Sequence, residues 1–283
     1  MTYLNKNITY VIALLLLLSS CNKPLEWPSS PLYFFEHENE VGLKKTREEV
    51  IQEIVGHYAH YDVVSYEDKT TKTPMRTFII SYGFTDFFME DGKLMMSNRF
   101  LFANQVMSRK NATSGISDEA VQAIKPVPQE VDLSFSGGQW HIYRPPTPTL
   151  LGITGDPALP LSKDPVDASL TDPDNDGNPG VTVHISVGKF FEGEIYITRR
   201  EIFSYYLKMN ADGTITGHVE DKSEQFVIGA SKKILAQPSN SVQHEDMGMS
   251  PVLLVPVDPE IDTAEELMEI RDEIFPEEPG FES

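Results

Sequence analysis

The chain has 283 residues, a formal net charge of −20 and a single cysteine. So acidic a chain does not offer the basic surface that nucleic-acid binding needs, which argues against DNA and RNA as partners. A lone cysteine has no partner within the chain, so no intrachain disulfide is expected.

The first twenty residues have the pattern of an export signal. Lys6 supplies one positive charge. The apolar run 11–18 is shorter than the roughly 20 residues that a helix needs to span a bilayer. We therefore interpret residues 1–20 as a signal peptide that is removed, and leave them out of the fold.

The run Leu18-Ser19-Ser20-Cys21 resembles the lipobox of bacterial lipoproteins. The resemblance implies that the Cys21 thiol is acylated, with palmitate as a typical acyl chain, and that Cys21 becomes the new N-terminus. The membrane is then a partner through this lipid anchor. Because Asn22 and not an aspartate follows, the resemblance favours the outer membrane of the cell envelope. The alternative is a generic signal peptide with a stray cysteine.

Residues 21–40 hold three prolines and several aromatic residues. We interpret them as a tether that becomes ordered near Leu32, with its aromatic side chains packed on the domain or lying near lipid. A helix is predicted next, because Thr46 and Glu49 form a capping-box pattern and Gly56 is placed to end the helix.

Residues 41–258 are predicted to form one β-rich domain. Gly56-x-Tyr58 is similar to the Gly-x-Trp motif that opens lipocalin-like barrels. The Asp-Gly pairs at 91–92 and 212–213 predict hairpin turns. Roughly eight to ten strands suit a single antiparallel barrel or sandwich, with a lipocalin-like barrel favoured. Strand patterns occur at 56–64, 75–82, 84–89, 93–106, 131–135, 139–143, 181–187, 194–209, 214–219, 224–230 and 252–257, and a short helix is predicted over 117–124.

Residues 145–180 are rich in Asp and Pro and show no clear period, so a long loop is expected. Within it Asp172, Asp174 and Asp176 alternate and Gly177 follows, so that a turn can aim several oxygens at one hard cation such as Ca²⁺. The pattern is similar to the loops of thrombospondin type 3 repeats and dockerins. The resemblance implies a calcium site that includes Asp172, Asp174, Asp176 and Asn178.

The similarity to calcium loops is partial. Val183 stands where an EF-hand has its bidentate glutamate, and the residues after Gly180 have a strand pattern, so an EF-hand is not expected. Asp164, Asp167 or a distant loop would supply the missing ligands. The alternative is an ordinary turn, since Asp, Asn, Gly and Pro are also turn residues. A bound ion is expected to be structural.

The C-terminal residues 259–283 are predicted to form an acidic helix and tail. Between Asp258 and Ser283 there are eleven acidic residues and one basic residue, Arg271. We expect a solvated helix face followed by a disordered end, and not a segment that docks on a partner. Deletion of 259–283 is therefore expected to leave the domain folded.

The sequence contains none of the common catalytic motifs, among them Gly-x-Ser-x-Gly and His-Glu-x-x-His. His57 and His60 fall on a predicted strand and are expected to point to opposite faces. We expect a lipid-anchored, non-enzymatic envelope protein that binds a small apolar ligand or a protein partner. The alternatives are a secreted hydrolase acting on glycans or lipids, and a calcium-dependent surface adhesion module.

Overall fold

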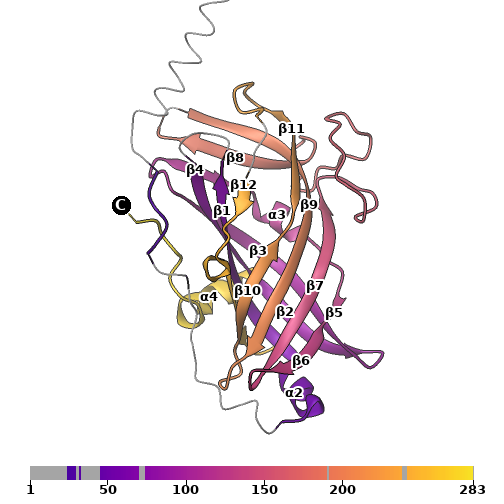
Figure 1. The fold of residues 1–283 in the computed structure, drawn as a ribbon. Helices are drawn as coiled ribbons and strands as arrows, with labels where there is room; N and C mark the ends of the chain where they lie inside the picture. Colours follow the sequence, from indigo (N-terminus) through magenta and orange to yellow (C-terminus); the bar gives the residue numbers. More distant parts are fainter. Residues whose placement is uncertain are drawn as a thin grey trace, which may run out of the picture.

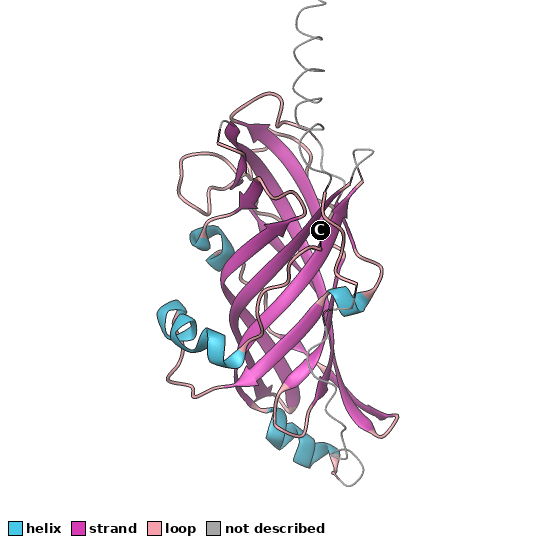
Figure 2. Ribbon diagram, turned by 90° about the vertical axis from the view of Figure 1, so that its left-hand side faces the viewer, coloured by secondary structure: helices cyan, strands magenta, loops and turns pink. Residues whose placement is uncertain are grey.

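The computed structural model describes residues 24–29, 32, 45–69, 74–189, 191–237 and 241–282. The lipobox and Cys21 lie outside these described residues. One antiparallel sheet curls into a half barrel, with short helices around it (Figure 1, Figure 2). The prediction of a mainly β chain with short N- and C-terminal helices is confirmed. No helix in the described part is long and apolar enough to cross a membrane.

The helices are α2 (Arg47–Ile54), α3 (Asp118–Gln122), the 3-10 turn η1 (Met247–Met249) and α4 (Ala264–Ile274). The strands are β1 (Gly56–Asp68), β2 (Met75–Glu90), β3 (Lys93–Met107), β4 (Ala112–Gly115), β5 (Gln129–Glu130), β6 (Asp132–Ser136), β7 (Gln139–Leu151), β8 (Val181–Val187), β9 (Phe191–Met209), β10 (Ile215–Asp221), β11 (Glu224–Ala230), β12 (Ser241–Gln243) and β13 (Pro251–Pro256).

Some neighbours in the sheet follow one another in the chain, and others are far apart in it. The order is β4-β8-β9-β10-β13-β1-β2-β3-β5, and β9 is long enough to pair with β7 and β11 as well. In this order β4 pairs with β8, and β13 lies between β10 and β1. At one end β5 pairs with β3 while the next strand, β6, pairs with β7. The chain thereby links the two sides of the curled sheet.

The concave side of the sheet is filled by side chains. One apolar cluster contains Tyr58 and Val64 of β1 together with Tyr205 of β9 and Ile215 of β10, so it joins strands from different parts of the curl. Successive residues of a strand point to opposite faces. The residues between those of β1, such as Tyr61, therefore pack on the convex side in a second cluster.

The C-terminal segment differs from the solvated helix and free end that its charge predicted. Leu267 of α4 is fully buried, and the Phe275 ring lies 5.9 Å from the Tyr82 ring on the convex face. Arg271 donates to the Tyr82 hydroxyl at 2.7 Å and to Glu278 at 2.9 Å. The acidic side chains lie on the outer side of the helix. The acidic composition of the helix therefore gave no indication of its apolar face, which covers the sheet.

The predicted tether is also shorter than 21–40. Glu26 forms an antiparallel bridge with Glu282, which brings the two ends of the described chain together. The Trp27 ring packs 5.2 Å from the rings of Phe78 and Phe281. Residues 24–29 are thus part of the domain. Of the two alternatives for the aromatic side chains, packing on the domain or lying near lipid, Trp27 follows the first.

The predicted loop 145–180 begins later in the structure, because β7 continues to Leu151. The pairing of β7 with β9 shifts register between Arg144 and Thr147. Pairing of β7 with β6 ends at Tyr143, so the prolines that follow need not donate to a strand on that side. A proline-rich stretch can therefore extend the strand, which its composition did not indicate.

Candidate functional site

The three aspartates of the predicted calcium loop converge just before β8. Asp172, Asp174 and Asp176 each offer a carboxylate oxygen, and these oxygens lie within 4.8 Å of one another. Asn175 and Gly177 adopt left-handed backbone angles, with φ of 55° and 88°, which curl the chain around the carboxylates. The aspartates thus lie together, and ion binding stays a prediction.

Asp174 has an oxygen that lacks a partner. Its Oδ2 accepts the Thr182 N–H at 2.9 Å. Its Oδ1 is buried and has no hydrogen bond within the described part of the chain. Burial and the charge of Asp176 raise the pKa of Asp174, against the effect of the Thr182 hydrogen bond. A cation among the three carboxylates would satisfy Oδ1 and offset their repulsion, so the residues fit a Ca²⁺ ion.

The other two carboxylates are held by local hydrogen bonds. Asp172 accepts the backbone N–H groups of Asp176 at 3.2 Å and Gly177 at 2.9 Å. Asp176 accepts from the Thr182 hydroxyl and from the Asn178 backbone at 2.8 Å. Although burial acts in the opposite direction, these bonds leave the pKa of Asp176 below its usual value. The loop is therefore organised around the carboxylates.

The additional ligands that the sequence suggested are placed differently. Asn178 turns its Nδ2 toward Asp176 Oδ2, at 3.1 Å. Asp167 is occupied by two serine hydroxyls, and Asp164 accepts the backbone N–H of Val166 at 3.0 Å. Among the described residues the acidic cluster consists of Asp172, Asp174 and Asp176. Further oxygens for an ion would have to come from the backbone or from water.

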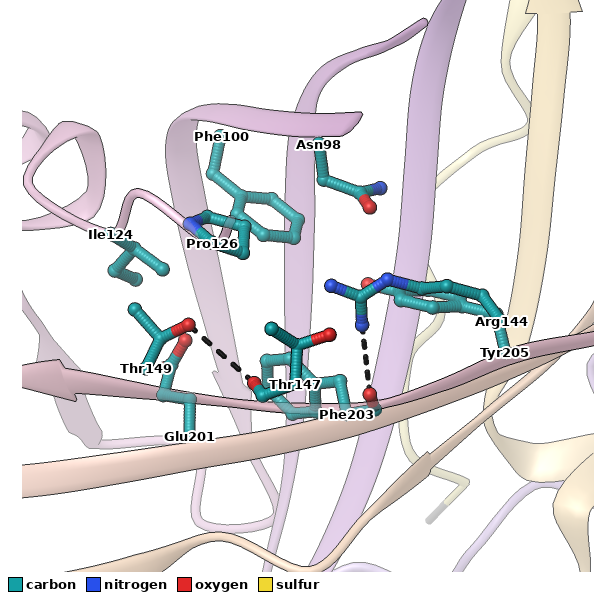
Figure 3. A pocket seen from close by; sticks show the side chains of 10 residues that line it. All are labelled: Asn98, Phe100, Ile124, Pro126, Arg144, Thr147, Thr149, Glu201, Phe203 and Tyr205. Carbon is teal, nitrogen blue, oxygen red and sulfur yellow. Dashed lines mark hydrogen bonds between the residues drawn. The ribbon is translucent and has the colours of Figure 1, made fainter. Parts of the chain in front are cut away.

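A second candidate site lies on the concave side of the sheet, where β3, β7 and β9 meet the segment after α3 (Figure 3). The cavity has a volume of about 10 Å³, which is room for about one water molecule. It is lined by both polar and apolar side chains: Asn98, Phe100, Ile124, Pro126, Arg144, Thr147, Thr149, Glu201, Phe203 and Tyr205.

Arg144 supplies the positive charge at this cavity and is only 2% exposed. Its Nη1 donates to the Phe203 carbonyl at 2.8 Å, and its guanidinium lies 5.4 Å from the centre of the Tyr205 ring. Its Nε is buried without a partner in the described chain, and none of the described ion pairs includes it. Burial lowers the pKa of Arg144. An anionic group in the cavity would complete its hydrogen bonding.

Glu201 lies across the cavity from Arg144 and is also buried. Its Oε1 accepts from Arg199 Nε at 3.0 Å, while Oε2 lacks a partner among the described residues. Burial raises the pKa of Glu201, and the charge of Arg199 opposes that shift. Asn98 Oδ1 is the third buried, unsatisfied atom among the lining residues.

Beside the cavity lies a buried histidine network. His60 Nδ1 is 2.8 Å from the Thr85 hydroxyl, and His60 Nε2 is 2.8 Å from Asp62. Hydroxyl, imidazole and carboxylate occur in the order of a hydrolase triad, but Thr85 is fully buried and cannot meet a substrate. His57 lies on the other face, 2.6 Å from Asp86, so the prediction of opposite faces is confirmed.

The sequence reasoning did not identify Arg144, Glu201 or Asn98. The sequence did contain one signal, because residues two apart in a strand point to the same face. Arg144 follows the inward-facing Ile142 by two residues, and Glu201 precedes Phe203 by two. A charged residue at an inward position of a strand points to a buried polar site. Which of these residues meet depends on the pairing of β7 with β9, and short-range patterns do not reveal that pairing.

The chain matches no protein-family model, and no curated protein or solved structure matches it significantly.

Proposed function

We propose that the chain is a lipid-anchored protein of the bacterial cell envelope, held in the outer membrane through acylated Cys21. The support is the run Leu18-Ser19-Ser20-Cys21, in which the chain's only cysteine follows a short apolar signal. We further propose that it is a non-enzymatic binding protein, whose ligand is a small molecule or part of a protein partner.

The observation that carries the binding role is the group of unsatisfied polar atoms at the concave cavity. The cavity has room for about one water molecule, which is about the space that one oxygen of a ligand carboxylate needs, and such an oxygen can accept from Arg144 Nε. A wholly apolar ligand would leave these groups unsatisfied, at a cost of about 1–3 kcal/mol for each. We therefore favour a ligand that places one carboxylate oxygen in the cavity beside Arg144 and keeps the rest of the molecule outside the cavity.

Thermal unfolding with acetate, propionate and butyrate tests this role, with matched chloride concentrations as the reference. The wild type is expected to show a higher midpoint with carboxylate, and Arg144→Gln to lose that rise relative to its own baseline. Lys222→Gln is the control, because Lys222 is an exposed cation on the β10–β11 turn. An equal rise in Arg144→Gln, or no rise in the wild type, would contradict the proposal.

The hydrolase alternative receives less support at this cavity. Glycoside hydrolysis commonly uses two carboxyl groups about 5–10 Å apart. Glu201 is the one carboxylate among the residues that line the cavity. The adhesion alternative depends on the calcium loop, whose residues Asn175, Asp176 and Gly177 are exposed. Calcium-dependent adhesion of cells that carry the protein would favour that alternative over the binding role.

We also propose that Asp172, Asp174 and Asp176 hold a structural Ca²⁺ ion. The support is the buried Oδ1 of Asp174, which lacks a partner within the described chain. An ion that binds only the folded state adds about 2.7 kcal/mol of stability at a hundredfold excess over its Kd. Extracellular calcium modules have Kd values of about 10⁻⁴–10⁻³ M, so stabilisation is expected at millimolar calcium.

A further inference from the structure

The cavity beside Arg144 lies along a gap in the curled sheet, which we call the seam. In the described chain, the outer edge of β3 pairs with β5 through Met95 and Met96 alone. The outer edge of β7 pairs with β6 only as far as Tyr143. Asn98 of β3 and Arg144 of β7 line the same cavity, so the unpaired edges of the two strands meet there.

The seam is filled by residues 116–126, which contain α3 and which we call the plug. Its buried side chains Ala120, Val121 and Ile124 belong to a third apolar cluster. In that cluster they pack with a set of sheet residues that we call the apolar wall: Phe100, Leu151, Val181, Val183 and Ile197. Ile124 and Pro126 also line the cavity, and Figure 3 shows them on the other side of it from Arg144. The plug therefore covers both the cavity and the apolar wall.

The plug has few hydrogen bonds to the rest of the domain. The backbone N–H groups of Val121, Ala123 and Ile124 donate within the plug. In the described chain its one hydrogen bond to the sheet is from Gln122 Nε2 to the Leu101 carbonyl, at 3.1 Å. The helix α3 has only five residues, and so short a helix is marginal by itself. Segments of this kind open locally at a lower free energy than the whole domain.

The strands at both ends of the plug can stay in place while it opens. Gly115 of β4 pairs with His184 of β8, and Gln129 of β5 pairs with Met96 of β3. Removal of the plug would join the cavity to the apolar wall, because Phe100 belongs to both. The opened site would then place a buried cation, Arg144, next to a hydrocarbon surface. Such a pocket, closed in the free protein, is cryptic.

We propose that the plug opens to admit a monocarboxylate with an unbranched hydrocarbon tail. The carboxylate accepts from Arg144, and the tail replaces Ala120, Val121 and Ile124 against the apolar wall. This inference rests on the proposed carboxylate-binding role of Arg144 and adds the class of the tail and its route of entry. Burial of the tail offsets the exposure of the plug, since both are governed by apolar area.

Titration calorimetry with octanoate, acetate and 1-octanol tests the class of ligand. The mature chain with Cys21→Ser is used, because detergent needed by an acylated protein would compete for an apolar site. We expect octanoate to bind at least about a hundredfold more tightly than acetate, since its longer chain buries more apolar surface. Octanol lacks the carboxylate and should bind more weakly than octanoate. Arg144→Gln should lose this preference for octanoate over octanol.

A matched pair of valine substitutions tests whether the plug competes with the tail. Val121→Ala weakens the packing of the plug, whereas Val63→Ala removes the same atoms from the convex cluster of the sheet. Because a weaker plug is open more often, Val121→Ala should bind octanoate about three- to tenfold more tightly than the wild type. Val63→Ala should leave the Kd for octanoate unchanged.

Hydrogen exchange reports the opening directly. The amides of Val121, Ala123 and Ile124 should exchange faster with octanoate than without it, because their hydrogen bonds lie within the plug. Slower exchange at these amides, or a Kd for octanoate no lower than that for acetate, would overturn the inference and leave the carboxylate role of Arg144 intact. Binding of neither acid would overturn the inference and the proposed function together.

Discussion

Substitution of one carboxylate, Asp174, should have opposite effects on the stability of the protein with and without calcium. Burial raises the pKa of Asp174 above its ordinary value of 3.8, so its ionised form destabilises the folded state. This destabilisation grows as the pH rises from 3.8 through the folded-state pKa, and it is absent below 3.8. Asp174→Asn removes the charge and should therefore raise the unfolding midpoint in chelator at pH 7.

The same variant should lose the rise that millimolar calcium gives to the wild type, because one of three carboxylates is gone. A stabilisation of 1 kcal/mol corresponds to about 2–4 °C in a domain of this size. Asp164→Asn is the control, since Asp164 lies in the same loop but outside the cluster. Calcium stabilisation of Asp174→Asn equal to that of the wild type would show that the loop is only a turn.

Gly83 in β2 allows two strands to approach more closely than any side chain permits. A Cβ atom at this position would lie 2.0 Å from the Arg99 carbonyl oxygen of β3, at a register shift between the strands. Gly83→Ala should force the backbones apart and destabilise the domain by about 1–3 kcal/mol. Gly115→Ala is a matched control, because its Cβ would meet nothing within 4 Å. Similar urea midpoints for the two variants would contradict this account.

At the scale of elements, α4 acts as part of the core even though its sequence is acidic. Leu267 is fully buried against the convex face, whereas its neighbour Met268 is 53% exposed. Leu267→Ala should cost about 2–5 kcal/mol of unfolding free energy, and Met268→Ala much less. Removal of residues 259–283 should likewise lower stability and expose the sheet. If the truncated protein were as stable in urea as the full chain, residues 259–283 would be dispensable for folding, as the sequence predicted.

The elements that the sequence predicted well are those specified by neighbouring residues. The capping box of Thr46 and Glu49 correctly placed α2, and Asp91-Gly92 placed the β2–β3 turn. The C-terminal helix and the strand over 252–257 were also predicted, but the sequence did not indicate which distant residues they contact. The apolar face of α4 needs the convex side of β1 and β2, and β13 pairs with β1 across almost 200 residues of sequence. Patterns among neighbouring residues of the sequence do not indicate such long-range contacts.

At the scale of the whole molecule, the two candidate sites differ in how far the sequence could reveal them. The aspartate loop is a single stretch, so the convergence of Asp172, Asp174 and Asp176 was visible in their spacing. The cavity combines Asn98 of β3 with Arg144 of β7 and Glu201 of β9. Any one of these residues looks ordinary in the sequence, and only the curl of the sheet brings them to one cavity.

The proposed lipid anchor would set both the compartment of the protein and its supply of calcium. The most direct measurement is mass spectrometry of the N-terminal peptide of the protein extracted from the membranes of its own host. We predict a peptide that begins at Cys21 and carries the mass of acyl chains, and a Cys21→Ser protein that no longer partitions with the membranes. A mature protein that begins elsewhere, or that carries an unmodified Cys21, would contradict the account.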